Sequence, residues 1–136
     1  MNKPLIGLAA LILASGIQTA TAAPADDACA ALMEARGNLV SMIGSTDKST
    51  YDGLKGKIQD ASAKLDATLA AMQKSYNAGD EAKAKEFKVV WDAFKGTRDT
   101  EIIPALYAGR NADAKAIATG IQAERMGKMK TTMACK

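Results

Sequence analysis

Apolar and small residues recur along most of the chain in steps of three and four, which is the spacing of one buried face of an α-helix. Turn-forming residues divide this pattern into four segments. The segments predict helices over residues 25–43, 49–77, 80–108 and 112–134. Because long runs of β-branched residues are missing from them, the pattern favours an all-α protein.

The arrangement of these helices follows from their seams and their turns. The second segment has the steps of three and four that are typical of a bundle seam, at Tyr51, Leu54, Ile58, Ala61, Leu65, Thr68 and Met72. The turns between segments are short, and short turns place consecutive helices side by side and antiparallel. The sequence therefore predicts an antiparallel up-down-up-down four-helix bundle.

Local details of the segments can also be predicted. Asp47 or Ser49 is expected to cap the second helix and Asn111 the fourth. Pro104 removes a backbone donor, so we expect a kink in the last turns of the third helix. In the fourth helix, the spacing predicts that Ile121 is buried.

The N-terminal segment has a different character. A positively charged start is followed by an apolar stretch over residues 5–17 and by the small-residue motif Ala20-Thr21-Ala22. This is the layout of a secretory signal peptide, so we expect residues 1–22 to be removed and residues 23–136 to form a periplasmic domain. Because residues 4–25 carry no charge, an uncleaved inner-membrane anchor is the alternative.

Composition argues against several classes of function. The 136 residues include 18 basic and 15 acidic side chains, a net charge of +3, and these charges are spread evenly, which argues against nucleic-acid binding. The chain has no histidine, the commonest general base and metal ligand. Its serines lack a G-x-S-x-G context and a recognisable base. We therefore expect no enzymatic activity and no cofactor.

The two cysteines, Cys29 and Cys135, lie near the two ends of the expected mature chain. In an antiparallel four-helix bundle the first helix begins and the last helix ends at the same pole, and these two helices are neighbours. In an oxidising compartment we expect a disulfide between them, worth about 4–5 kcal/mol in the chain-entropy model. A bond between two chains is the alternative.

Three arginines, Arg36, Arg98 and Arg125, fall on or beside the apolar faces of the predicted helices. Counted from the turn pole they lie at similar depth, about 15–20 Å at 1.5 Å per residue. Guanidinium groups at one level form a bidentate site for an anion, with Thr97 and Ser41 as polar companions. The alternative is that each arginine pairs with a nearby acidic residue and extends along a seam.

Two groups of apolar residues have both a structural and a functional interpretation. Trp91 and Phe94 fit the bundle core, and they could also form the apolar wall of an anion site. Met126, Met129 and Met133 lie close together in the fourth segment, and thioethers are ligands that suit Cu(I). For these methionines we favour the filling of irregular gaps in the core.

One stretch of the chain is similar to a known family. It comprises Trp91-x-x-Phe94-x-x-x-Arg98-Asp99, then Ile102-Ile103-Pro104-Ala105, then a Gly109-Arg110 turn into the last helix. This order resembles the third-to-fourth helix segment of the four-helix-bundle sensory domain of methyl-accepting chemotaxis receptors. The resemblance implies a non-enzymatic, periplasmic module in signal transduction that binds a small anionic metabolite or a membrane partner protein.

The resemblance also bears on the site and on the alternatives. It implies that arginines of the first helix bind the anion, which Arg36 matches in helix and depth, and it leaves a homodimer open. Two other functions remain. One is a structural or stress-related envelope protein without a small ligand, and the other is a Cu(I)-binding bundle.

Overall fold

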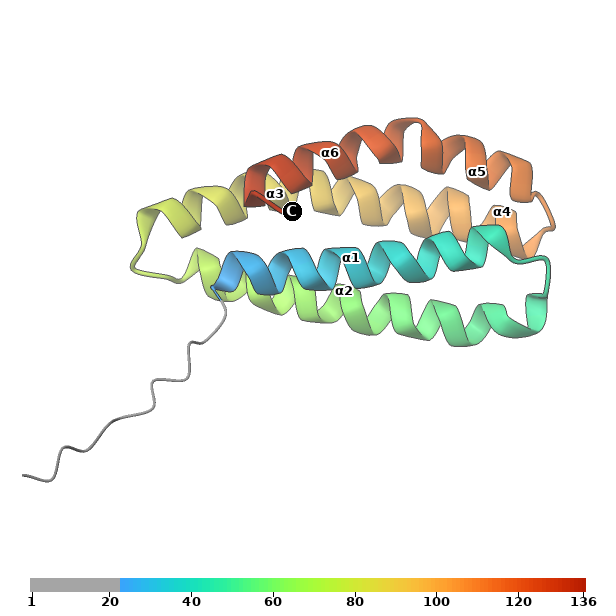
Figure 1. The fold of residues 1–136 in the computed structure, drawn as a ribbon, viewed down its shortest axis with the longest axis horizontal. Helices are drawn as coiled ribbons and strands as arrows, with labels where there is room; N and C mark the ends of the chain where they lie inside the picture. The colour runs from blue at the N-terminus through green and yellow to red at the C-terminus, as the bar shows by residue number, and fades with distance from the viewer. Residues whose placement is uncertain (1–22) are drawn as a thin grey trace, which may run out of the picture.

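The computed structural model describes residues 23–136, and these residues form an antiparallel bundle of four long helices (Figure 1). The first bundle helix is α1 and the second is α2, while the third comprises α3 and α4, and the fourth comprises α5 and α6. The bounds are Pro24–Gly44 for α1, Tyr51–Gln73 for α2, Ala78–Thr97 for α3, Ile103–Tyr107 for α4, Asn111–Thr119 for α5 and Ile121–Met133 for α6. The predicted all-α bundle is confirmed. The predicted signal peptide lies outside the described residues.

Local sequence sets most helix starts. Pro24 stands in the first turn of α1, where its missing N–H has no helical partner to lose, and acidic residues follow it. Asp47 accepts a hydrogen bond from the backbone N–H of Ser49 at 3.0 Å, in a short 3₁₀ turn that leads into α2. Asn77 accepts from the N–H of Gly79 at 2.9 Å and so caps α3.

The third bundle helix changes its hydrogen-bonding pattern where a kink was predicted. A π-helix over Arg98–Ile102 separates α3 from α4. Pro104 stands in the first turn of α4 and has no N–H to give to the carbonyl of Thr100. A wider π turn accommodates the missing bond and changes the directions of the side chains that follow.

The fourth bundle helix is not continuous, contrary to the prediction. Gly120, with φ −94° and ψ −110°, interrupts it between α5 and α6. Because the break turns α6 relative to α5, Ile121 is 46% exposed instead of buried, and Gln122 is buried in its place. Side chains predicted from an unbroken helical period therefore change faces at this point.

Asn111 does not serve as the N-cap of α5, a second correction. Arg110 occupies the cap position, and the amide of Asn111 donates to the backbone carbonyls of Ile43, at 3.3 Å, and Ser45, at 3.1 Å. Carbonyls at a helix C-terminus have no partner within the helix, so a side-chain donor from the neighbouring turn can satisfy them. Asn111 thus ties the start of α5 to the end of α1.

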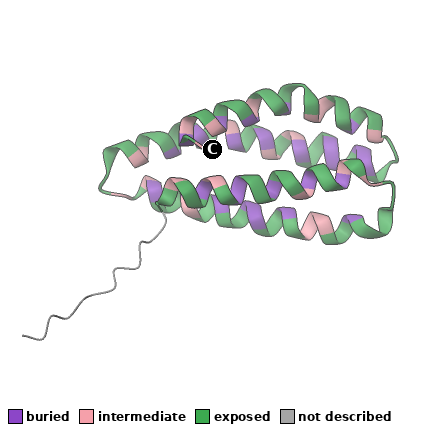
Figure 2. Cartoon of the chain, viewed as in Figure 1, coloured by how far each residue is buried: buried purple, intermediate pink, exposed green. Residues whose placement is uncertain are grey.

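The core runs along the inner faces of all four bundle helices (Figure 2). Its largest fully buried side chains are Trp91, Tyr51, Phe87, Leu32, Met42, Ile58, Leu65, Leu69, Met72, Ile102, Leu106 and Met129. Burial of each large apolar side chain contributes about 1.5–3 kcal/mol. Met126 and Met133 are buried as well, so the structure supports core filling for the three methionines.

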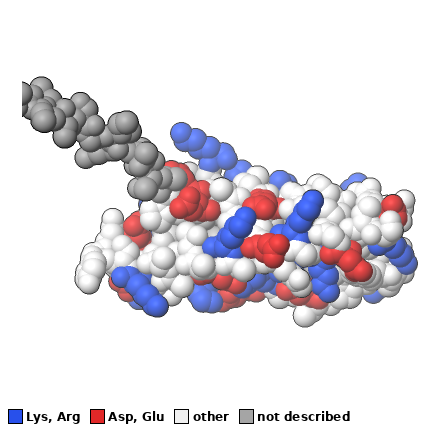
Figure 3. Space-filling view, turned by 90° about the horizontal axis from the view of Figure 1, so that it is seen from below, with Lys and Arg blue, Asp and Glu red and all other residues white. Residues whose placement is uncertain are grey.

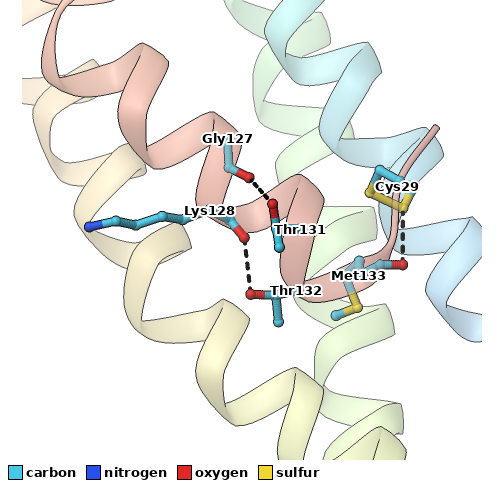
Figure 4. The surroundings of a disulfide bond; sticks show 7 residues. Cys29, Gly127, Lys128, Thr131, Thr132 and Met133 are labelled. Carbon is cyan, nitrogen blue, oxygen red and sulfur yellow. Dashed lines mark hydrogen bonds between the residues drawn. A yellow bond between two sulfur atoms is a disulfide. The ribbon is translucent and has the colours of Figure 1, made fainter.

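A disulfide joins the two ends of the described chain (Figure 4). It links Cys29 in the second turn of α1 to Cys135 just after α6, with 5.6 Å between the two Cα atoms. The bond is within one chain, as the bundle topology predicted. Because both cysteines are oxidised, neither supplies a thiolate to a metal.

No helix within residues 23–136 has both the length and the apolar character that a bilayer-spanning segment requires. Basic and acidic side chains lie next to one another on the face seen in Figure 3. On that face the charges of both signs are mixed, unlike the single-sign field that nucleic-acid binding uses.

Candidate functional site

The guanidinium of Arg98, a residue of the predicted anion site, makes hydrogen bonds within the bundle. Its side chain is 3% exposed and starts from the π-helix. Nη1 donates to the hydroxyl of Ser62 on α2 at 2.8 Å, while Nε and Nη2 donate to the two carboxylate oxygens of Asp99 at 2.7 and 3.1 Å. The guanidinium carbon also lies 5.8 Å from the centre of the Trp91 ring. Arg98 therefore has partners of its own within the protein.

Arg125 links α6 to α3. Its Nη1 donates to the hydroxyl of Thr97 at 2.7 Å and to Oε1 of Gln122 at 3.0 Å. The structure thus brings together Arg125 and Thr97, two residues of the predicted site, but in a contact between helices. Ser41, another predicted member, is exposed and donates to the carbonyl of Gly37 one turn earlier in α1.

Of the five residues of the predicted anion site, Arg36 alone lines a groove between α1 and the fourth bundle helix. Arg98 and Arg125 do not line this groove, and each is hydrogen-bonded elsewhere in the bundle. The depth count gave only the position of each arginine along its helix, whereas hydrogen bonds to Ser62 and Thr97 hold Arg98 and Arg125 in contacts between helices.

The groove lies between α1 and the fourth bundle helix and has a volume of about 340 Å³. Its apolar lining consists of Leu39, Val40, Ile43, Phe94, Ala118, Ala123 and Met126. Its polar lining consists of Arg36, Lys115, Thr119 and Gln122. This size and this mostly apolar wall with few polar groups are typical of small-molecule sites.

Two sequence features leave this space open. Ala118 and Ala123 present only methyl groups toward α1 where larger side chains would fill the seam. Gly120 stands between them, and its break lets α5 and α6 contribute separately to the groove wall. Phe94, from α3, also lines the groove.

Gln122 holds this wall in place. It is 2% exposed, its Nε2 donates to the carbonyl of Phe94 at 2.9 Å, and its Oε1 accepts from Arg125. A buried amide with both ends satisfied fixes the relative position of α3 and α6. Sequence reasoning missed Gln122 because the unbroken helical period buried Ile121; the available signal was the glycine in the helix two residues before Gln122.

The electrostatics of the groove favour an anion. Arg36 on α1 and Lys115 on α5 stand on opposite walls, and none of the described residues that line the groove is acidic. By contrast, the hollow between α2 and α3 has its charges paired, because Asp66 accepts from Lys95 at 2.9 Å and from the indole N–H of Trp91 at 2.8 Å. The groove therefore combines two cations with an apolar interior.

Met126 alone of the three candidate Cu(I) ligands lines the groove. Within residues 23–136, no cluster of three or more His, Cys, Asp or Glu side chains is placed to hold a metal ion.

Comparison with known proteins supports a family assignment. A family model described as a four helix bundle sensory module for signal transduction matches residues 22–134. This range includes almost the whole described chain, with all four bundle helices and the groove. Comparisons with curated proteins and with solved structures found no match.

Proposed function

The chain belongs to the family of four-helix-bundle sensory modules for signal transduction, and we propose on this basis that it senses a small anionic molecule bound between α1 and the fourth bundle helix. One observation carries the proposal. Arg36 on α1 and Lys115 on α5 both line a groove of about 340 Å³ whose lining includes no acidic residue among the described ones. An anion there would meet two cations without displacing an internal ion pair.

The two cations have different chemical roles in this proposal. The guanidinium of Arg36 is planar and offers parallel N–H donors, which match the two oxygens of a carboxylate. The ammonium of Lys115 is a compact point charge that supports the anion from the opposite wall. Arg36 and Lys115 are both exposed, so they are accessible to a ligand.

We further propose that the module works in the periplasm as a non-enzymatic protein. A disulfide such as Cys29–Cys135 persists in an oxidising compartment, and residues 1–22 would direct export. Ligand binding would be communicated to a membrane partner protein through the outer faces of the helices. A homodimer is compatible with this role.

Calorimetric titration with small carboxylates tests the function. We expect at least one anion to bind, and Arg36→Gln and Lys115→Gln each to weaken its binding at least tenfold. A saturating ligand at 100 times its Kd should add about 2.7 kcal/mol to the free energy of unfolding. Lys57→Gln is the control, because it removes an exposed cation from α2, away from the groove.

If no anion binds, the sensory proposal fails and a structural envelope protein without a small ligand becomes the better description. If an anion binds equally well to the native protein and to both groove variants, the groove is not the site.

A further inference from the structure

We infer that the groove selects amphipathic monoanions, meaning a single carboxylate attached to an elongated apolar body, over dicarboxylates and amino acids. This inference rests on the proposed function and specifies its ligand class. It follows from how polar and apolar groups are distributed over the groove wall.

The apolar part of the wall is large and continuous. Leu39, Val40 and Ile43 extend along about one turn of α1, roughly 6 Å at 1.5 Å per residue. Phe94 and Met126 line the same space from α3 and α6. Each methylene that a ligand buries against such a surface raises affinity about fourfold. An apolar body of six to eight carbons would thus contribute much of the binding.

The polar side chains of the wall have few groups left for a second polar end on the ligand. The amide of Gln122 is used by the carbonyl of Phe94 and by Arg125. The hydroxyl of Thr119 donates to the backbone carbonyl of Lys115 at 2.8 Å. Only the two cations remain as strong donors in this lining, and with both directed at one carboxylate no strong donor is left for a second.

The polar groups of the groove wall disfavour amino acids and dicarboxylates as ligands. The ammonium group of an amino acid needs acceptors, and the described lining offers no carboxylate to provide them. A second carboxylate would have to lie against Leu39, Phe94 or Met126, where it would lose its hydration without a compensating partner. A ligand with one charged end avoids both costs.

Calorimetry on the mature protein can compare four probes of defined chemistry. Octanoate, below its micelle concentration, has the charge and the apolar body; 1-octanol has the body alone; succinate and aspartate have charge without the body. We expect octanoate to bind at least tenfold more tightly than each of the other three. Arg36→Gln should reduce octanoate binding toward that of 1-octanol.

A pair of valine variants tests whether the apolar body of the ligand lies in the groove. Val40 is 52% exposed and lines the groove, whereas Val89 is 73% exposed on α3 and does not line it. Both substitutions to asparagine should be tolerated by the fold because both side chains are exposed. We expect Val40→Asn to weaken octanoate binding at least fivefold and Val89→Asn to leave it unchanged.

The outcomes separate the two proposals. Binding of succinate or aspartate as tight as that of octanoate, with loss in Arg36→Gln, would overturn the ligand class and leave the sensory function intact. Failure of every anion to bind would overturn both. Equal octanoate binding by the two valine variants would overturn the inference, and so would sedimentation showing a dimer that Val40→Asn dissociates, because a second copy would then occupy the groove.

Discussion

Arg36 and Arg98 have opposite surroundings, because Arg98 is buried and Arg36 is exposed. Arg98 is 3% exposed, and a buried guanidinium is unfavourable unless it is paired and hydrogen-bonded. The carboxylate of Asp99, which is exposed, pairs with the charge of Arg98. The buried hydroxyl of Ser62 accepts a hydrogen bond from Nη1 of Arg98. Arg36, by contrast, is exposed and lines the groove. Arg98 therefore contributes to stability, while Arg36 is accessible to a ligand.

Replacement of Ser62 by alanine tests the inner contact of Arg98. Loss of the hydroxyl leaves the Nη1 donor without its acceptor in a buried setting, so we expect the free energy of unfolding to fall by about 1–3 kcal/mol. Urea denaturation measures the change. Ser41→Ala is the matched control, because Ser41 is exposed, bonds within its own helix and has the same change in helix propensity. Equal effects of the two variants would contradict the role given to Ser62.

At the scale of secondary structure, the break between α5 and α6 determines the shape of the groove. Gly120 still donates its N–H to the carbonyl of Ala116 at 3.1 Å, but its ψ of −110° ends the regular helix. The next helix starts with a new orientation, which buries Gln122 and exposes Ile121. A continuous helix would present Ile121 to the seam instead.

Substitution of two glycines in the fourth bundle helix tests this break. A Cβ at Gly120 would lie 3.1 Å from the backbone carbonyl oxygen of Ala116, which is too close without a backbone shift, so Gly120→Ala should destabilise the protein by about 1 kcal/mol. A Cβ at Gly127 in α6 meets no atom within 4 Å, so Gly127→Ala should stabilise it by about 0.5–1 kcal/mol. Thermal unfolding measures both. Stabilisation by both variants would show that α5 and α6 can merge.

At the scale of the whole molecule, each pole of the bundle is closed by contacts between distant parts of the chain. At one pole the disulfide joins residues that are 106 positions apart. At the other pole Asn111 donates to carbonyls at the end of α1 and to the hydroxyl of Tyr51, which itself donates to the carbonyl of Ser45 at 2.6 Å. The first and fourth bundle helices are thus connected at both ends, and the groove lies between these connections.

Reduction of the disulfide measures how much this cross-link contributes to the free energy of unfolding. A cross-link over this separation is worth about 4–5 kcal/mol in the chain-entropy model, so reductant should lower the free energy of unfolding by that amount. Urea denaturation with and without reductant provides the measurement. The Cys29→Ser, Cys135→Ser double variant should match the reduced protein and be insensitive to reductant. An unchanged midpoint in reductant would mean that the bond does not constrain the unfolded chain.

The sequence alone determined the class of fold, the antiparallel order of the helices and the pairing of Cys29 with Cys135. These features depend on short-range information: the helical spacing of apolar residues, the short turns and the requirement that four helices bury one face each. Trp91 was placed in the core on the same basis and is fully buried. The family resemblance came from a local stretch as well, and the family match over residues 22–134 confirms it.

Only the tertiary structure decided which polar side chains meet and which line the groove. The predicted convergence of Arg36, Arg98 and Arg125 relied on a uniform 1.5 Å rise per residue and on unbroken apolar faces. The π-helix and the break at Gly120 each alter that turn, and a change in rotation moves every later side chain to another face. Gln122, which follows the break, became buried in this way. Distance along a helix is a local property, whereas the direction of a side chain depends on every interruption before it.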